Sequence, residues 1–426
     1  MSEPMVSSRV RRSRVTSYSA HGDLSHLTSE AQLLILLART ALSGALQIEI
    51  QDRVRESVNW PLVWQLAREH GVAPLVYRTL MAHCPAALPR ETRESFRRHV
   101  QANAMFNTLL ADELVTLIDA FAAKGIRAIP FKGPTLGVMA YGDLTLRECM
   151  DLDLIVEQSY IPQARHVLWS HGYQLASRDE MDGKDVEDEP FHSFIKKNGM
   201  FRVDLQWTMA RRLFSFRLDR EHFWEHLKPV RLPRKAIMSL APEELLIILC
   251  VHGSKHAWED LKWVCDVAEL IRRRRNLDWS RVLHLSREWG YERMVLMGLA
   301  MARCIFDAAL PRHVCQIVDS DADIPDLVKR MPRRLLKVRS QGIDERDAEA
   351  LYFTLKDSWS ERWKYGVALS RAEVSAVTTP LPWFHSQERL RVLHRMLQPL
   401  HCFVARWTPT GWLRRHIVKC FENSGC

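Results

Sequence analysis

The spacing of apolar residues divides the chain into helical stretches and a short central region of strands. Between residues 28 and 123, apolar positions recur about every 3.6 residues, the period of a helix that is buried on one face. One stretch begins at Asn59, a residue type that caps helix starts, has Pro61 in its first turn and stops at Gly71. A longer stretch stops at Gly125. The pattern therefore predicts an N-terminal helical region.

The period changes after Gly125. Short apolar or alternating segments follow, and turn residues bound them, which is typical of β-strands. The four predicted strands are IRAIPF (126–131), LDLIVE (152–157), FHSFIKK (191–197) and FRVDLQW (201–207). Residues 134–142 and 161–172 have the spacing of helices between the strands, and the chain after Trp207 has a helical pattern to its end.

These patterns predict an α+β fold, in which a small mixed sheet of the palm type is embedded between predominantly α-helical regions. At 426 residues the chain is longer than one typical domain. Its first residues are rich in serine and arginine, which indicates a disordered tail or, as the alternative, a transit peptide. The predicted parts are a basic tail (1–27), an N-terminal helical region (28–123), the α/β module (124–208), a helical domain beside it (209–310) and a C-terminal helical region (311–426).

Composition restricts the class of protein. Apolar residues make up 47% and charged residues 26%, as in globular proteins. The net charge of +9 favours polyanionic partners such as nucleotides or RNA, with a basic surface of no specific partner as the alternative. Nine cysteines without a CxxC pair favour reduced thiols and a cytoplasmic location. The apolar run from Ala31 to Ile50 contains Arg39, so we expect one buried helix there and no integral membrane association.

Two aspartates alternate with leucines at the second predicted strand. Side chains alternate across a strand, so Asp151 and Asp153 share one face while Leu152 and Leu154 take the other. Asp204 has the same kind of position in the fourth strand, and neighbouring strands would bring the three carboxylates together. Because unpaired buried charge is expensive, the cluster predicts either a solvated acidic edge or a set of oxygen ligands for Mg²⁺ or Mn²⁺. The third aspartate favours the metal.

A set of motifs in and after the α/β module carries a family resemblance. The motifs are FKG (131–133), Arg147, DLDL (151–154), DLQW (204–207) and HGSKHAWEDLKWVCD (252–266). Segment 131–156 resembles the signature of the DNA polymerase β-like nucleotidyltransferase superfamily. From about Trp60 to Leu310 the chain resembles the bacterial family of uncharacterised nucleotidyltransferases. It departs from the family pattern at Pro134, which lacks a backbone donor, and at Gln206, where histidine is common.

The resemblance implies transfer of a nucleoside monophosphate from an NTP with the help of two metal ions. The implied metal ligands and catalytic residues are Asp151, Asp153 and Asp204, the last also serving as general base. Gly133 would let the backbone approach the nucleotide phosphates. Lys132 would contact a phosphate, with an ordinary turn lysine as the alternative. Arg147 would steady a phosphate or pair with the acidic cluster, with an ordinary surface arginine as the alternative.

A stripe of polar and aromatic residues follows in the helical region. If one helix runs from Glu243 through Leu270, one face of it carries His252, His256, Glu259, Trp263 and Asp266. Gly253 weakens this continuity, because a glycine within a helix indicates a break or a close approach as the alternative. Such a stripe either faces solvent or lines a cleft, and the family's H…H…W…D pattern at these positions favours the cleft. We therefore expect the stripe to face the acidic sheet and to form the base or acceptor side of an active cleft.

Three functions are compatible with these features. The first is a metal-dependent nucleotidyltransferase that acts on a small-molecule or peptide acceptor and releases pyrophosphate. The second is a toxin-like nucleotidyltransferase that acts on tRNA, which the charge of +9 permits. The third is a degenerate nucleotide-binding scaffold, which the presence of all three aspartates disfavours. A basic path to the acidic cluster would favour tRNA, and a closed pocket roofed by helices would favour a small acceptor. The sequence specifies neither the acceptor nor the NTP.

Overall fold

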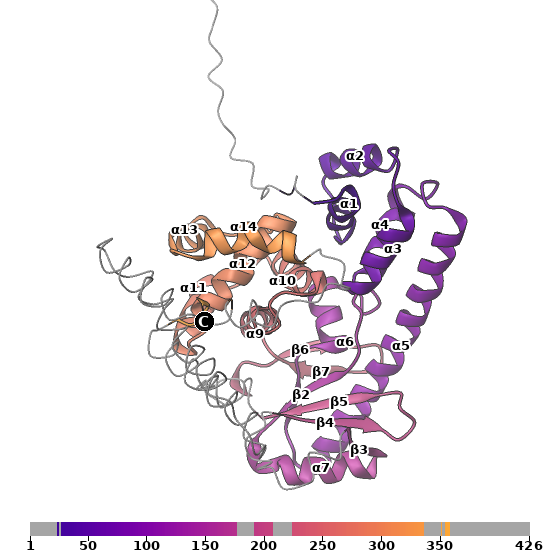
Figure 1. Ribbon diagram of the computed structural model, residues 1–426. Helices are drawn as coiled ribbons and strands as arrows, with labels where there is room; N and C mark the ends of the chain where they lie inside the picture. The colour runs from indigo at the N-terminus through magenta and orange to yellow at the C-terminus, as the bar shows by residue number, and fades with distance from the viewer. Residues whose placement is uncertain are drawn as a thin grey trace, which may run out of the picture.

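A computed structural model of the chain describes residues 24, 27–176, 191–207, 224–335, 351 and 354–357. The predicted basic tail up to residue 23, the acidic segment 179–189 and the sequence beyond residue 357 lie outside the described residues. The described part contains a five-stranded mixed sheet, a two-stranded hairpin and many helices (Figure 1). The predicted α+β fold is confirmed. None of the helices described combines the length and the apolarity needed to cross a bilayer.

The N-terminal helices match the predicted helical region. Their bounds are α1 (Ser29–Leu37), α2 (Gly44–Arg53), α3 (Trp60–Glu69), α4 (Ala73–His83) and α5 (Arg90–Ala122). The side chain of Asn59 accepts a hydrogen bond from the backbone N–H of Leu62 and so caps α3. Gly71 and Gly125 follow α3 and α5 with positive φ angles of 64° and 70°, which glycine adopts without strain. These helix ends are confirmed.

The prediction of one buried helix over residues 31–50 is wrong. The chain leaves the helix at residue 38 because the next residues are bonded to distant helices. The guanidinium of Arg39 donates to the backbone oxygens of Ile305 and Phe306 at 3.0 and 2.8 Å. The backbone N–H of Thr40 donates to Glu269 Oε1 at 3.0 Å. A new helix, α2, then begins after Ser43, whose side chain caps it.

The central sheet has the strand order β1-β2-β5-β4-β3. Its strands are β1 (Ala128–Pro130), β2 (Leu152–Val156), β3 (Tyr173–Leu175), β4 (Phe191–Lys196) and β5 (Arg202–Gln206). The pair β2–β5 is parallel, and the other pairs are antiparallel. Four of these strands are the predicted ones, and β3 is an addition. The predicted helices between them correspond to α6 (Gly133–Leu136), the π-helical turn η1 (Gly137–Tyr141) and α7 (Ile161–Ser170).

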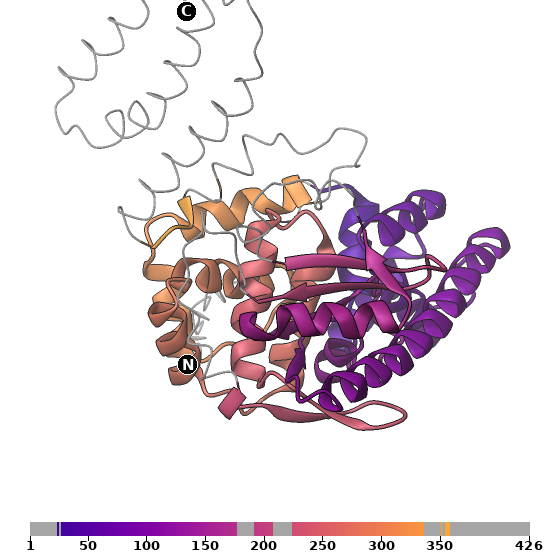
Figure 2. The ribbon, with the colours of Figure 1, turned by 90° about the horizontal axis from the view of Figure 1, so that it is seen from below.

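Helices cover the sheet from two sides. In Figure 1, α7 lies below the sheet, while α9 and α10 lie above it. Figure 2 shows the same arrangement from below, with α5 along one flank. The helices after the sheet are α9 (Pro242–Lys255), α10 (Leu261–Arg273), α11 (Trp279–Glu288), α12 (Glu292–Phe306), α13 (Arg312–Ser320) and α14 (Ile324–Leu335). The sheet therefore has one face toward α7 and one toward the second helical region.

The prediction that the chain is helical throughout after Trp207 is wrong. The strands β6 (Lys228–Arg231) and β7 (Ala236–Ser239) form an antiparallel hairpin. The hairpin is joined to the sheet, because the hydroxyl of Ser239 donates to the backbone oxygen of Pro130 in β1. Strands of four residues leave too short an alternation to be detected by period alone.

The continuous helix from residue 243 to residue 270 that the stripe assumed is absent, and Gly253 marks the close approach that was its alternative. Helix α9 ends at Lys255 and α10 begins at Leu261. Between them Ala257 and Trp258 have φ angles of 51° and 56°, in the left-handed region that ends a helix. The indole of Trp258 is fully buried and lies so close to Gly253 that a Cβ atom there would be 2.4 Å from the ring. Packing of this indole therefore breaks the helix.

Candidate active site

The two aspartate-bearing strands are neighbours, and their aspartates are in register. In the parallel pair β2–β5, Asp153 lies opposite Asp204. The flanking positions Leu152, Leu154 and Leu205 are all at most 1% exposed, so these apolar residues hold the strands against the core. Because side chains alternate, the carboxylates take the opposite face of the sheet. The predicted convergence of acidic strands is present, because Asp153 and Asp204 lie on adjacent strands and neighbouring strands in a sheet are about 4.8 Å apart.

Asp153 is buried and receives two donors on one oxygen. Lys132 Nζ lies 2.9 Å from Asp153 Oδ1, and Gln206 Nε2 donates to the same atom at 2.9 Å. The two ionic side chains are 12% and 3% exposed. Burial raises the pKa of Asp153 to about 6; Lys132 opposes this shift, and the charges of Asp151 and Asp204 add to it. Repulsion among the three carboxylates thus contributes to the raised pKa of Asp153.

Asp204 has a different set of partners. The hydroxyl of Ser193, directly opposite on β4, donates to Asp204 Oδ1. Arg202 Nε lies 3.4 Å from the same oxygen and 2.8 Å from the hydroxyl of Ser193. Both contacts fix the orientation of the carboxylate and use one of its two oxygens.

The turn after β1 brings Lys132 to the carboxylates. Gly133 has a φ angle of 55°, and a Cβ atom at this position would lie 3.1 Å from the backbone oxygen of Asp151. Glycine therefore satisfies both a left-handed backbone and a close approach to the start of β2. The hydroxyl of Thr135 donates to the backbone oxygen of Lys132 at 2.8 Å and closes the turn.

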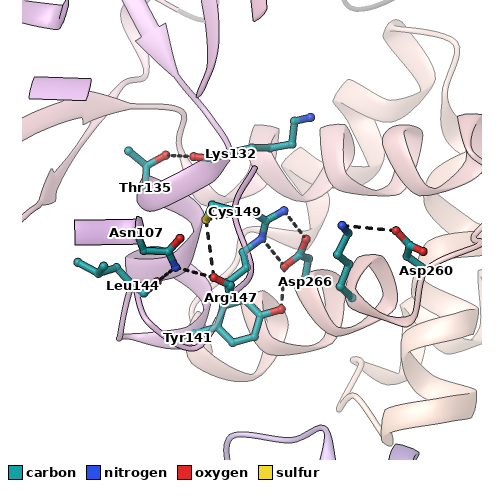
Figure 3. A network of polar contacts seen from close by, with 10 residues as sticks. Asn107, Lys132, Thr135, Tyr141, Leu144, Arg147, Cys149, Asp260 and Asp266 are labelled. Atoms are coloured by element: carbon teal, nitrogen blue, oxygen red, sulfur yellow. Dashed lines mark hydrogen bonds and ion pairs between the residues drawn. The ribbon is translucent and has the colours of Figure 1, made fainter. Parts of the chain in front are cut away.

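Arg147 is directed to Asp266 rather than to the three clustered aspartates. Its Nε and Nη2 atoms lie 2.9 and 3.0 Å from the two oxygens of Asp266, and the hydroxyl of Tyr141 donates to the same carboxylate at 2.7 Å. Figure 3 shows these side chains converging on Asp266, while Asn107 donates to the backbone oxygens of Leu144 and Arg147. The carboxylate of Asp266 holds the pKa of Arg147 well above its usual range, although burial opposes the charge. This network joins the loop before β2 to α10.

The second wall of the site comes from α9, α10 and the turn between them. His252, His256 and Trp263 form a cluster in which the ring centroids are 4.7–5.5 Å apart. Burial, followed by the charge of Lys132, lowers the pKa of His252 well below its usual value. Burial and then the charge of Lys255 lower the pKa of His256 to about 4. Both imidazoles are therefore neutral at pH 7.

The two walls enclose one cleft with a volume of about 380 Å³. The predicted site residues that line it are Lys132, Arg147, Asp151, Asp153, Asp204, His252, His256 and Trp263. Gly133 does not line the cleft, but it lies close to the backbone of Asp151, which does. Asp266 is 1% exposed and contacts the site through Arg147. The structure thus brings the acidic strands and most of the predicted helical stripe to one cavity.

The comparison with protein families agrees with this geometry. The chain matches the model of the family described as uncharacterised nucleotidyltransferase over residues 56–307, which is more than half of its length. The chain belongs to this family. Its general activity is therefore nucleotidyl transfer with a nucleoside triphosphate as a substrate. None of the curated proteins compared with the chain matches it.

The region of this nucleotidyltransferase that matches the family model extends beyond the sheet. Residues 56–307 include the three aspartates on one wall of the cleft and the helices α9 and α10 that form the other. The family resemblance is thus confirmed, and the region that matches contains both walls of the cavity.

The donor set of the acidic wall fits a hard divalent cation. Three carboxylates supply only oxygen ligands, which Mg²⁺ and Mn²⁺ prefer. In the described residues, however, no group of three or more acidic, histidine or cysteine side chains is arranged to hold a metal ion. The ammonium group of Lys132 takes the place of a cation beside Asp153. The residues present fit a metal by the chemistry of their oxygen donors, and one of the three carboxylates is paired with Lys132.

Several residues that line the cleft, and one that supports it, lay outside the sequence prediction. Ser193 could have been found only from the register of β4 against β5, which places it opposite Asp204. Glu148 and Met150 flank the predicted motif, and no residue type or spacing marked them. The other unpredicted lining residues are Phe131, Gln206, Ile248, Val251, Lys255, Lys262, Trp289 and Tyr291.

Proposed function

We propose that this nucleotidyltransferase transfers a nucleoside monophosphate from an NTP to a hydroxyl or phosphate group of a small-molecule or peptide acceptor, with release of pyrophosphate. The observation that carries the proposal is the in-register pair Asp153 and Asp204 in a cleft that α9 and α10 cover. A volume of about 380 Å³ suits a small ligand. The roof that α9 and α10 form over the carboxylates favours a small acceptor over tRNA.

Mg²⁺ or Mn²⁺ is the cofactor that this proposal requires. Asp151, Asp153 and Asp204 are the residues that would hold it, because they are the carboxylates of the acidic wall. When bound, the metal would neutralise charge on the phosphates and on the carboxylates.

Asp204 is the candidate general base for a hydroxyl acceptor. Its Oδ1 atom is held by Ser193 and Arg202, so Oδ2 is the atom that would take the proton. As the proton moves to Oδ2, the acceptor oxygen forms a bond to the α-phosphorus and the bond from that phosphorus to the pyrophosphate oxygen breaks. A phosphate acceptor that is already ionised needs no such proton transfer.

Nucleotide binding is assigned to the turn and the loop that flank β2. Lys132 would contact a phosphate, and Gly133 would permit close approach of the backbone. Arg147 would contribute its charge from behind the cleft and hold the loop that leads to Asp151, because its guanidinium is bonded to Asp266. Asp266 thus acts through Arg147 in this proposal.

The neutral wall of His252, His256 and Trp263 would bind the base or the acceptor. An indole supplies a surface for stacking, which contributes about 1–3 kcal/mol for each base in nucleic-acid complexes. Neutral imidazoles can both donate and accept hydrogen bonds. If the proposal holds, His256→Ala and Trp263→Ala raise KM for either the NTP or the acceptor. Unchanged kinetics for every substrate would exclude this wall.

The direct test is incubation of the protein with each labelled NTP, Mg²⁺ and a host-cell extract that has been divided into small-molecule, peptide and RNA fractions. We expect label in a small-molecule or peptide fraction. Asp151→Asn and Asp153→Asn should leave the fold intact and abolish transfer. Asp326→Asn, which changes an exposed carboxylate of a surface pair, is the matched control and should retain it. Near wild-type transfer by either site variant would refute the assignment of the acidic wall.

The same assay distinguishes the two alternatives. Label in the RNA fraction would favour a toxin-like enzyme that acts on tRNA. A protein that binds NTP but labels no fraction would favour a degenerate scaffold.

A further inference from the structure

The ammonium group of Lys132 lies beside Asp153 in the acidic wall of the cleft. We propose that Lys132 is the resident counter-ion of the acidic wall and that it exchanges partners, from Asp153 in the free protein to a nucleotide phosphate when the metal and the NTP bind. This inference rests on the proposed function, since it takes Asp151, Asp153 and Asp204 as metal ligands.

The first observation is the ion pair itself. Lys132 Nζ lies 2.9 Å from Asp153 Oδ1, and the two side chains are 12% and 3% exposed. A carboxylate so deeply buried needs a compensating charge, because removal of one partner of a buried pair leaves the other uncompensated. Asp153 and Asp204 are opposite each other in the sheet, which increases the local negative charge. In the free protein, Lys132 supplies this compensating charge.

The second observation is the position of Lys132, whose side chain lines the cleft, and the presence of a second donor on Asp153. Lys132 belongs to the turn after β1 and lines the cleft, so its flexible side chain can swing toward a ligand. Gln206 donates to the same oxygen of Asp153 at 2.9 Å. This neutral donor stays on the carboxylate when the ammonium group departs, and it does not repel an incoming cation as a second positive charge would.

The third observation places the ammonium group between the walls. Lys132 lines the same cleft as Asp153 on one wall and His252 and His256 on the other. A phosphate chain in the cleft would meet Lys132 together with Lys255 and Lys262, which also line it. Lysine serves as a mobile point charge for phosphate.

The exchange makes metal and nucleotide binding cooperative. Without nucleotide, a metal ion must displace an ammonium group that has no better partner, so metal binding is weak. With nucleotide, the displaced lysine gains a phosphate, and part of the cost of displacement is recovered. The protein therefore loads its metal preferentially as the metal–NTP complex.

The test is a titration of Mn²⁺ without nucleotide, followed by electron paramagnetic resonance, on the full chain. Lys132→Met should bind Mn²⁺ about tenfold more tightly than wild type, which corresponds to about 1.4 kcal/mol. Lys329→Met is the matched control, since Lys329 lies outside the cleft and pairs with the exposed Asp326 at 3.2 Å. Its affinity for Mn²⁺ should stay within about twofold of the wild-type value. A non-hydrolysable NTP should tighten Mn²⁺ binding in wild type and much less in Lys132→Met.

A measurement on the wild-type protein covers the case in which Lys132→Met does not fold. Acylation of individual lysines, followed by mass spectrometry, should find Lys132 slow to react in the free protein. Mn²⁺ should accelerate its reaction, and added NTP analogue should slow it again.

The outcomes separate this inference from the proposed function. If Lys132→Met binds Mn²⁺ no more tightly than wild type, or if Mn²⁺ leaves the reactivity of Lys132 unchanged, the exchange is refuted. If Asp204→Ala still weakens Mn²⁺ binding in that case, the proposed metal site stands without the lysine exchange. If Asp204→Ala binds Mn²⁺ as tightly as wild type, the metal site of the proposed function fails.

Discussion

Removal of the negative charge at Asp266 should destabilise the fold several times more than the same change at a surface carboxylate. The carboxylate of Asp266 is 1% exposed and accepts from Arg147 twice and from Tyr141 once. Asp266→Asn keeps the shape of the side chain but leaves the buried guanidinium of Arg147 without a counter-charge. Loss of one partner of a buried ion pair costs about 3–5 kcal/mol. The amide oxygen still accepts one hydrogen bond, so we expect a value of about 3 kcal/mol.

This value is large compared with the stability of a typical protein, about 5–15 kcal/mol. The control is Asp326→Asn, because Asp326 pairs with Lys329 where both side chains are more than two-thirds exposed. A surface pair contributes about 0–1 kcal/mol, so the control should change stability by less than about 0.5 kcal/mol. The two variants remove the same charge, and they differ in burial.

The assay is urea unfolding followed by tryptophan fluorescence and circular dichroism. Asp266→Asn should lower the midpoint without a change in the slope, which reports the surface exposed on unfolding. The double variant Arg147→Met/Asp266→Leu should recover most of the loss, because it leaves no unpaired buried charge. A loss below about 1 kcal/mol for Asp266→Asn, or a double variant as unstable as the single one, would refute a desolvated ion pair at this position.

Three further predictions concern backbone geometry and pH. Burial and then the charge of Arg165 lower the pKa of the buried His192 to about 4. The neutral imidazole therefore contributes to the stability of the fold above pH 6.5, and this contribution is lost as the pH falls toward 4. The loss amounts to about 2 kcal/mol at pH 5. His192→Phe should reduce the loss of stability on acidification, whereas the exposed His284→Gln should not. Gly133→Ala should cost about 1–3 kcal/mol in urea unfolding, since its φ angle of 55° and a carbonyl oxygen at 3.1 Å both oppose a Cβ atom. Gly253→Ala should lower the melting temperature through overlap with a buried indole, at about 1–3 kcal/mol, and an unchanged melting temperature would contradict the packing.

The acidic wall could be predicted from sequence because its determinants are local. The alternation of Asp153 with two leucines defines which face the carboxylate takes, and Asp204 repeats the pattern. The structure adds the register that places the two opposite each other. A local pattern cannot reveal Ser193 in the same way, because its contact with Asp204 depends on how β4 pairs with β5.

The individual side-chain pairs between distant segments could not be predicted. Arg147 and Asp266 are 119 positions apart, and the pattern of neither segment indicates that the two would pair. The break between α9 and α10 depends on the indole of Trp258, which lies between the two helices and packs against Gly253 of α9 and near Gly298 of α12. A helix period continues through such a break in the sequence, so the predicted stripe reached the cleft by way of two helices and not one.

The last prediction concerns the extent of the folding unit. The family match covers residues 56–307 and includes both walls of the cleft, yet the structure ties it to segments outside. Arg39, which precedes the matched region, is 8% exposed and contacts the end of α12 through two backbone oxygens and Asp307 at 2.8–3.0 Å. Helix α1 buries most of its side chains in the same core. Loss of this packing exposes apolar surface, at about 25 cal/mol per Å².

A fragment limited to residues 56–307 should therefore unfold at a lower temperature than the full chain and should expose apolar surface to a fluorescent dye. Arg39→Met tests one contact alone: it keeps a long apolar side chain but leaves the carbonyl oxygens at the end of α12 without their donors. A loss of about 1–3 kcal/mol is expected for it, which urea unfolding can resolve. If the fragment melts cooperatively at the temperature of the full chain, the matched region is autonomous. In that case the contacts of Arg39 and α1 add nothing to the stability of the cleft.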